Sequence, residues 1–168
     1  MKASILYHSN TGNTKKMTEV IAEGMLSVEG VTVNVFSFTE ADHAYIKESS
    51  CVLFGTPTYL ASMSGAMKNW LEGPAFKLGL AGKLGGAFST ADYLHGGGDI
   101  GIMNILNHLM VLGMLTYSGG SSFGNPVIHL GPVALRKSFS DYEDVFRIYG
   151  QRVATKSKEL FTACPFTV

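Results

Sequence analysis

Charged residues are scarce and evenly balanced in this sequence. They make up 15% of the 168 residues, with 13 Lys and Arg against 13 Asp and Glu. A net charge of zero without a basic stripe argues against a protein that binds nucleic acid. No apolar run approaches the ~18 residues that a membrane span needs. The apolar stretch before Ser9 is too short for a signal peptide, so we expect a cytoplasmic protein.

Cysteine is also rare, and Cys51 and Cys164 are its two occurrences. They lie far apart and form no Cys-x-x-Cys pair, so neither a disulfide framework nor a metal site is predicted. Cys51 opens an apolar run, which is typical of a small core residue. A length of 168 residues predicts one domain over residues 1–168, large enough to bury a substantial core, and a hydrophobic content of 46% is typical of a compact protein.

What the sequence does contain is a regular alternation of strand and helix patterns. Short apolar runs predict strands over 3–8, 31–38, 51–54, 84–90 and 114–117. Helical patterns lie between and after them, over 14–28, around 42–47, from Ser62 or Ser64 to Glu72, over 99–112 and from about 143 onward. This alternation predicts an α/β fold with a doubly wound, five-stranded parallel sheet and helices on both faces.

Three further patterns concern the second half of the chain. Residues 118–135 are rich in Gly, Ser and Pro and predict a long irregular loop. The segment 140–143 matches a capping box and would open the last helix. The inner side of that helix would carry Val145, Ile148, Tyr149, Val153 and Leu160. The helix over 99–112 is apolar almost all round, which favours a partner surface and a homodimer or higher homo-oligomer.

The stretch after the first strand is polar and uncharged, and it leads directly into a helix. It comprises Ser9, Asn10, Thr11, Gly12, Asn13 and Thr14. Gly12 allows a tight turn, and the free amides and dipole of a helix N-terminus attract a phosphate. The alternative is an ordinary polar turn with a hydroxyl helix cap. The sequence contains no Gly-Lys-Ser/Thr ending, so a Walker P-loop is excluded.

Two more loops follow strands at the same expected edge of the sheet. In the first, Pro57 should stiffen the chain and Tyr59 offers a flat apolar face. In the second, glycines from Gly96 onward would let backbone amides approach a ring. The glycine pattern beginning at Gly96 also matches a dinucleotide fingerprint, but it begins several residues after its strand and lacks the expected acidic residue. His95 and His129 fit either proton transfer to a flavin or quinone, or exposed loop positions.

These motifs resemble those of the flavodoxin-like superfamily. Ser-Asn-Thr-Gly-Asn-Thr looks like the flavodoxin phosphate loop, which holds the phosphate of FMN. Gly-Thr-Pro-Thr followed by Met-Ser-Gly-x-Met-Lys-Asn is similar to WrbA-type NAD(P)H:quinone oxidoreductases. The resemblance implies a strand order of 2-1-3-4-5 and bound FMN. It implies that the flavin is lined by Pro57, Thr58, Tyr59, Leu60, Ser89, Thr90, Ala91, Asp92, Tyr93 and Gly96.

Two functions remain open on these residues. The first is an enzyme in which FMN takes hydride from NADPH or NADH and passes two electrons to a quinone or another flavin. The second is a flavodoxin-type one-electron carrier that docks with redox proteins. Carriers usually have a glycine beside the flavin, whereas none occurs between Thr56 and Ser64, and the zero net charge gives no acidic docking field. Both features favour the enzyme, for which the sequence indicates no catalytic side chain.

Overall fold

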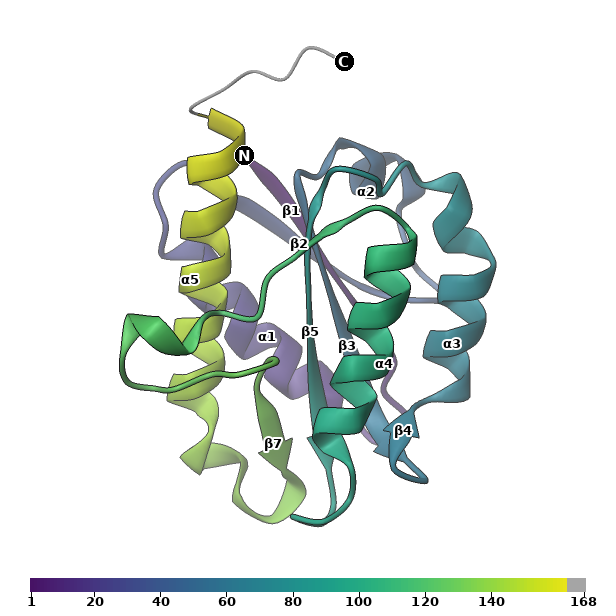
Figure 1. The fold of residues 1–168 in the computed structure, drawn as a ribbon, viewed down its shortest axis with the longest axis vertical. Helices are drawn as coiled ribbons and strands as arrows, with labels where there is room; N and C mark the ends of the chain where they lie inside the picture. Colours follow the sequence, from purple (N-terminus) through teal and green to yellow (C-terminus); the bar gives the residue numbers. More distant parts are fainter. Residues whose placement is uncertain (163–168) are drawn as a thin grey trace.

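A parallel sheet forms the centre of the protein (Figure 1). The computed structural model describes residues 1–162. The strands are β1 (Lys2–Tyr7), β2 (Thr32–Ser37), β3 (Cys51–Tyr59), β4 (Ser62–Met63), β5 (Leu84–Ala91), β6 (Leu115–Thr116) and β7 (Val133–Leu135). The main path runs β2-β1-β3-β5-β6, with all neighbours parallel. The predicted α/β class with a parallel sheet is therefore confirmed, and the main path has the expected 2-1-3-4-5 order. The sheet differs from the predicted five strands because β4 pairs with β3 and β7 pairs with β5, which makes seven.

Helices cover both faces of this sheet. They are α1 (Asn13–Leu26), α2 (His43–Glu48), α3 (Gly65–Glu72), α4 (Gly98–Val111) and α5 (Glu143–Thr162), with short 3-10 turns η1 (Pro74–Lys77), η2 (Ser121–Phe123) and η3 (Arg136–Asp141). Figure 1 shows α1 and α5 on one side of the sheet and α3 and α4 on the other. Strand alternation divides the core accordingly, because Ile5 packs in the α1/α5 cluster and Leu6 in the other cluster.

Strand β3 is longer than the apolar run over 51–54 predicts, since it continues to Tyr59 and includes Pro57. Strand β1 ends opposite Gly55, so beyond that point β3 has a parallel neighbour only on the β5 side. A proline is tolerated where one ladder has ended. The extension carries Thr58 and Tyr59 to the edge of the sheet, where β3 turns back into the short antiparallel strand β4.

The last strand of the sheet is split in two. β6 pairs with the start of β5 at Leu84 and Gly85, and β7 pairs with its end from Ser89 to Ala91. The predicted irregular loop over 118–135 is confirmed except for β7 and the single turn η2. Arg152 of α5 holds the loop, because its guanidinium donates to the carbonyl oxygens of Gly119, Gly120, Phe123, Gly124, Asn125 and Pro126.

Two predictions about helix ends had different outcomes. Ser64 caps α3, since its hydroxyl accepts from the Met67 amide at 3.2 Å. The predicted capping box is wrong: Ser140 lies within η3, and its hydroxyl donates to the Asp141 carboxylate at 3.4 Å. The prediction that Leu160 lies on the inner side of the last helix is also wrong, because 38% of this residue is exposed. Tyr149 and Val153 are buried, as predicted.

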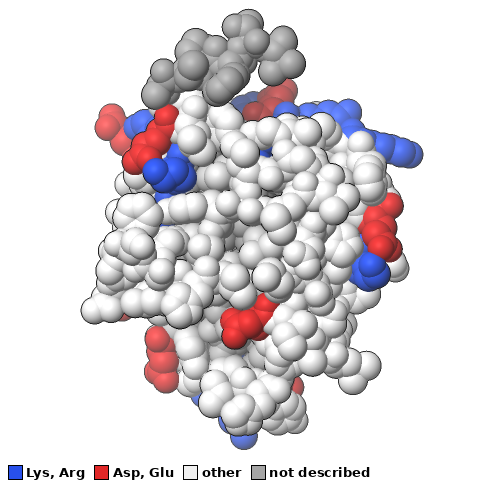
Figure 2. Space-filling model, in the orientation of Figure 1, with Lys and Arg blue, Asp and Glu red and all other residues white. Residues whose placement is uncertain are grey.

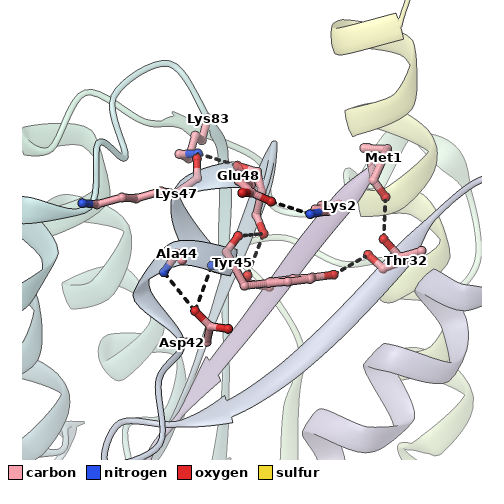
Figure 3. Close-up of polar contacts among 11 residues, drawn as sticks. Met1, Lys2, Thr32, Asp42, Ala44, Tyr45, Lys47, Glu48 and Lys83 are labelled. Atoms are coloured by element: carbon pink, nitrogen blue, oxygen red, sulfur yellow. Dashed lines mark hydrogen bonds and ion pairs between the residues drawn. The ribbon is translucent and has the colours of Figure 1, made fainter.

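Polar contacts tie the strands together at their amino-terminal ends (Figure 3). Asp42 caps α2 by accepting from the amides of Ala44 and Tyr45 at 2.9 and 3.0 Å. Lys2 pairs with Glu48, and Lys83 donates to the Lys47 carbonyl at the end of α2. These contacts stabilise the edge of the sheet opposite the cavity described next.

Candidate functional site

A cavity of about 370 Å³ opens where β1, β3 and β5 end. In an open parallel sheet this is the edge where ligands bind. The cavity is lined by Ser9, Asn10, Thr11, Asn13, Thr14, Pro57, Thr58, Tyr59, Leu60, Thr90, Ala91, Asp92, Tyr93 and Gly96. The structure thus brings together every predicted site residue except Gly12 and Ser89. It adds Ala61, Arg136 and Phe139, which the sequence did not indicate.

The first wall of the cavity is the loop that enters α1. Gly12 is the residue before the helix, with φ at +84°, and no side chain caps the helix there. The first intrahelical donor is the Lys16 amide, which bonds to the Gly12 carbonyl at 2.9 Å. The amides of the preceding turn remain available for an anion, and the helix dipole adds partial positive charge. Gly12 therefore shapes the loop although it does not line the cavity.

A hydrogen bond joins this loop to the neighbouring wall. The hydroxyls of Thr14 and Thr90 are 2.9 Å apart and both residues are buried. Ser89 points to the other face of the sheet, where its hydroxyl donates to the Gly98 carbonyl at 3.1 Å. The alternation along β5 thus explains why Thr90 lines the cavity and Ser89 supports the start of α4 instead.

Two buried hydroxyls in the cavity wall have no hydrogen-bond partner within the described residues: Ser9 Oγ and Thr58 Oγ1. A buried polar group without a partner is costly, so a hydrogen-bond partner from outside the chain is expected for each of these hydroxyls. Ser9 belongs to the loop before α1 and Thr58 to the end of β3, so these two residues line two walls of one cavity. FMN, with a phosphate, a hydroxylated chain and a ring edge bearing heteroatoms, fits this donor set.

Aromatic side chains stand at the mouth of the cavity. Tyr59 is 42% exposed and Tyr93 is 73% exposed, and both line the cavity. Asn10 donates to the Tyr59 hydroxyl at 3.1 Å, and the His8 ring meets the Tyr59 ring edge-on at 6.3 Å. These contacts hold Tyr59 in place, so its ring offers a fixed apolar surface for a flat ligand.

The turn between β3 and β4 has an unusual backbone. Leu60 and Ala61 both lie in the left-handed region, with φ at +50° and +58°. Such a turn normally takes Asn or Gly, because other side chains are strained there. A Cβ on Gly97 would lie 2.7 Å from the Ala61 Cα, so this glycine lets the neighbouring loop approach the turn. The turn between Thr56 and Ser64 therefore adopts the left-handed conformation although it contains no glycine.

The two candidate histidines lie outside the cavity lining. His95 is exposed in the loop before α4. His129 is exposed in the long loop, beside a separate hollow that Met103, Met110 and Leu130 also line. Neither placement supports a role in proton transfer at this cavity.

Sequence reasoning missed Arg136 and Phe139 because they follow β7, in the short stretch between the predicted irregular loop over 118–135 and the predicted capping box over 140–143. The pairing of Leu135 with Ala91 brings η3 beside the end of β5. Arg136 then pairs with Asp92, with 3.7 Å between Nη1 and Oδ2. The signal in the sequence was the apolar segment 133–135, which is too short to stand out from its Gly- and Pro-rich surroundings.

Residues 1–162 contain neither a cluster of metal ligands nor a membrane-spanning helix. No group of three or more His, Cys, Asp or Glu side chains is placed to hold a metal ion there. No helix in that range is long and apolar enough to cross a lipid bilayer. The cytoplasmic location expected from the sequence stays a prediction, and Cys164 lies outside the described residues.

The fold and the cavity define a flavodoxin-like α/β protein, in which a loop entering the first helix faces the loops after β3 and β5. The family model described as flavodoxin matches residues 5–92. A flavodoxin of Clostridium saccharobutylicum is 44% identical over 161 residues, covering 96% of this chain and 100% of that protein. The chain therefore belongs to the flavodoxin family, which confirms the resemblance seen in its loops.

Further relatives show how widely this architecture is shared. An NAD(P)H dehydrogenase (quinone) of Acidithiobacillus ferrooxidans is 28% identical, over 94% of this chain and 97% of that one. The solved structure of a flavodoxin from the domain Archaea superposes with a TM-score of 0.78 at 26% identity. The superposition covers 94% of this chain and 99% of the archaeal flavodoxin chain. The sequence identity to the flavodoxin of Clostridium saccharobutylicum, 44%, is thus higher than the 28% to this quinone dehydrogenase.

Proposed function

We propose that the chain is one FMN-binding domain that acts as a flavodoxin-type electron carrier. The observation that carries the proposal is the cavity at the strand ends, with the unpartnered Ser9 and Thr58 hydroxyls in its walls. Family membership and the full-length similarity to a flavodoxin support the same function. This choice favours the second of the two functions that the sequence left open.

In this proposal different residues hold different parts of the FMN molecule. The loop from Ser9 to Thr14 holds the phosphate at the start of α1. Tyr59, Tyr93, Pro57 and Thr58, which line the cavity, would hold the ring. FMN supplies the electron-transfer chemistry when it is bound, and the protein supplies binding, orientation and exclusion of water.

Protein partners would approach at the mouth of the cavity. Leu60 is fully exposed at 101%, and Leu94 is exposed at 76%. These apolar side chains lie on the two loops that carry Tyr59 and Tyr93. An apolar rim favours docking by burial of apolar surface rather than by long-range electrostatic steering, which agrees with the net charge of zero.

An NAD(P)H-dependent quinone or flavin reductase is the second candidate. The observation that favours it is the similarity to quinone dehydrogenases over nearly the full chain. In that case NADPH or NADH would donate hydride and a quinone or free flavin would be the small-molecule acceptor.

One experiment separates the two candidates. The purified protein is loaded with FMN and mixed anaerobically with NADPH or NADH, with the flavin absorbance recorded. A carrier should bind FMN and stay oxidised on the timescale of seconds, and a redox partner protein should then reduce it. Rapid bleaching of the flavin absorbance by NADPH or NADH, followed by reoxidation of the flavin with a quinone, would establish the reductase instead.

We further propose that two copies of the chain pair through α4. From Ile100 to Leu135 the sequence contains no Asp, Glu, Lys or Arg, and Figure 2 shows the almost uncharged surface that results. Ile100, Met103, Asn107 and Met110 form an exposed stripe along the outer side of α4. An uncharged face gives no electrostatic complement for a charged partner, and a two-fold axis would pair it with the same uncharged face of a second copy. The Asn107 amide, both donor and acceptor, can pair with its symmetry mate and set the register.

A further inference from the structure

Arg136 lines the cavity from a different segment than the loop before α1. It follows β7, whose residues Ala134 and Leu135 pair with Thr90 and Ala91 of β5. Arg136 is therefore next in register with Asp92, and the two side chains form an ion pair at 3.7 Å. Both side chains are more than half exposed, at 61% and 52%.

The alternation of side chains places this pair on the α1 side of the sheet. Thr90 faces α1, as its hydrogen bond to Thr14 shows, and Ala134 beside it packs in the α1/α5 core. Side chains two residues further along point to the same face, which continues this row to Asp92 and Arg136. Arg136 thus borders the part of the cavity that contains the first turn of α1.

A second contact shows that η3 lies against the same turn. The Lys16 Nζ of α1 is 6.0 Å from the centre of the Phe139 ring, and Phe139 lines the cavity together with Arg136. Lys16 itself pairs with Glu143 at 2.9 Å and does not line the cavity. The wall built by η3 and the wall built by the phosphate loop are therefore neighbours.

The lining of this cavity contains few charged side chains. Among the described residues that line it, Arg136 is the one cation and Asp92 the one anion. The loop from Ser9 to Thr14 offers hydroxyls, amides and a helix dipole, but no full positive charge. A loose, exposed ion pair contributes little to stability, whereas a guanidinium binds a phosphate dianion through two parallel hydrogen bonds.

We propose that Arg136 exchanges Asp92 for the phosphate of FMN and completes the phosphate site begun by the loop before α1. This inference rests on the proposed function, because it requires FMN in the cavity. Asp92 loses its partner in the exchange, but at 52% exposure it remains hydrated, so the exchange costs little.

The test compares FMN with riboflavin, which has the same ring but no phosphate. Binding of each to the apoprotein is measured by quenching of flavin fluorescence. Arg136→Gln should weaken FMN binding about tenfold to a hundredfold, the range for a lost charge-assisted hydrogen bond, and leave riboflavin binding within about twofold. Arg136→Lys should restore part of the FMN affinity, since it keeps the charge but loses the bidentate geometry.

Two further variants sharpen the result. Asp92→Asn removes the competing carboxylate, so FMN binding should become tighter. Lys137→Gln removes an exposed cation next to Arg136 that does not line the cavity, and FMN affinity should not change. The FMN affinity of the unaltered protein should also fall more steeply with salt than that of Arg136→Gln.

The possible failures are distinguishable. If Arg136→Gln weakens FMN and riboflavin equally, or weakens neither, the phosphate is held by the loop alone and the inference is wrong. If the unaltered apoprotein takes up neither flavin, the proposed function itself fails. Thermal unfolding of each variant checks that the fold is intact, which is expected because Arg136 and Lys137 are exposed.

Discussion

At the scale of single residues, the unpartnered hydroxyls of Ser9 and Thr58 give the sharpest expectation. Ser9→Ala and Thr58→Val should each weaken FMN binding about fivefold to tenfold, the value of one neutral hydrogen bond. The same changes should leave the apoprotein equally or more stable, because they remove a buried group that has no partner. Fluorescence titration measures the first effect and thermal unfolding of the apoprotein the second.

Ser157 provides the matched control for this prediction. Its hydroxyl is also buried without a partner, but it lies in α5 and does not line the cavity. Ser157→Ala should therefore change apoprotein stability in the same direction and leave FMN affinity unaltered. A cavity variant that binds FMN as tightly as the unaltered protein would show that these hydroxyls do not meet the cofactor.

The residue scale also shows where sequence reasoning stops. The polar loop before α1 could be predicted because its composition and its place between a strand and a helix determine its chemistry. The left-handed turn at Leu60 and Ala61 could not, because neither residue type signals positive φ. Its conformation depends on the pairing of β4 with β3 and on the close approach of Gly97, which are contacts between distant segments.

At the scale of elements, α1 and α5 pack with unusually little space between their backbones. A Cβ on Gly150 would lie 2.2 Å from the Ile21 carbonyl oxygen, and a Cβ on Gly24 would lie 1.9 Å from that of Arg147. Gly150→Ala should lower the free energy of unfolding by about 1–3 kcal/mol, although alanine is the better helix former, because the helices must move apart. Chemical denaturation measures this loss.

Gly65→Ala is the control for Gly150→Ala. Gly65 opens α3, and a Cβ there would have no atom within 4 Å. This substitution should leave stability unchanged or raise it slightly, by about 0.5–1 kcal/mol. Equal stability of the two variants would contradict the close packing of α1 on α5.

The exposed stripe of α4 leads to a prediction about assembly. The protein should sediment at about twice the 18.0 kDa of one chain at micromolar concentration. Met110→Glu places a charge in the uncharged face and should yield monomers that still bind FMN. Leu26→Glu introduces the same charge at an exposed apolar residue of α1 and should leave the dimer intact. A monomeric unaltered protein, or a dimer that tolerates Met110→Glu, would contradict the pairing through α4.

Elements with a strong hydrophobic pattern were predictable, whereas those defined by pairing were not. The apolar runs of β1, β3 and β5 and the stripe of α1 place their residues in the two core clusters. The three-residue strand β7 gains its identity from β5, so the sequence indicates it only as part of a loop. Arg136 and Phe139 enter the cavity for the same reason, and the site was incomplete without them.

At the scale of the whole molecule, the buried thiol of Cys51 couples folding to alkaline pH. Burial raises the pKa of this thiol from 9.0 to about 12. Above the unfolded pKa the unfolded chain loses the proton while the folded chain retains it. The contribution of Cys51 to the free energy of unfolding is therefore fully present below pH 9. It falls as the pH rises toward 12, by at most about 1.4 kcal/mol per pH unit.

The comparison of Cys51→Ala with the unaltered protein checks this coupling. Both proteins carry Cys164→Ser, so that Cys51 is the one thiol that differs. Denaturant unfolding between pH 8 and pH 11 should give a shallower loss of stability in Cys51→Ala. Some loss remains, because burial also raises the pKa of Tyr149. Parallel pH profiles in the two proteins would exclude Cys51 as a source.

As a flavodoxin-type carrier, this molecule would transfer electrons one at a time on a bound FMN. The most direct test is an anaerobic redox titration of the FMN-loaded protein with dithionite, in the presence of potential-measuring dyes. We expect FMN uptake at the ratio of one per chain and two resolved one-electron steps. A single two-electron step, together with direct reduction by NADPH or NADH, would contradict the carrier and favour the reductase.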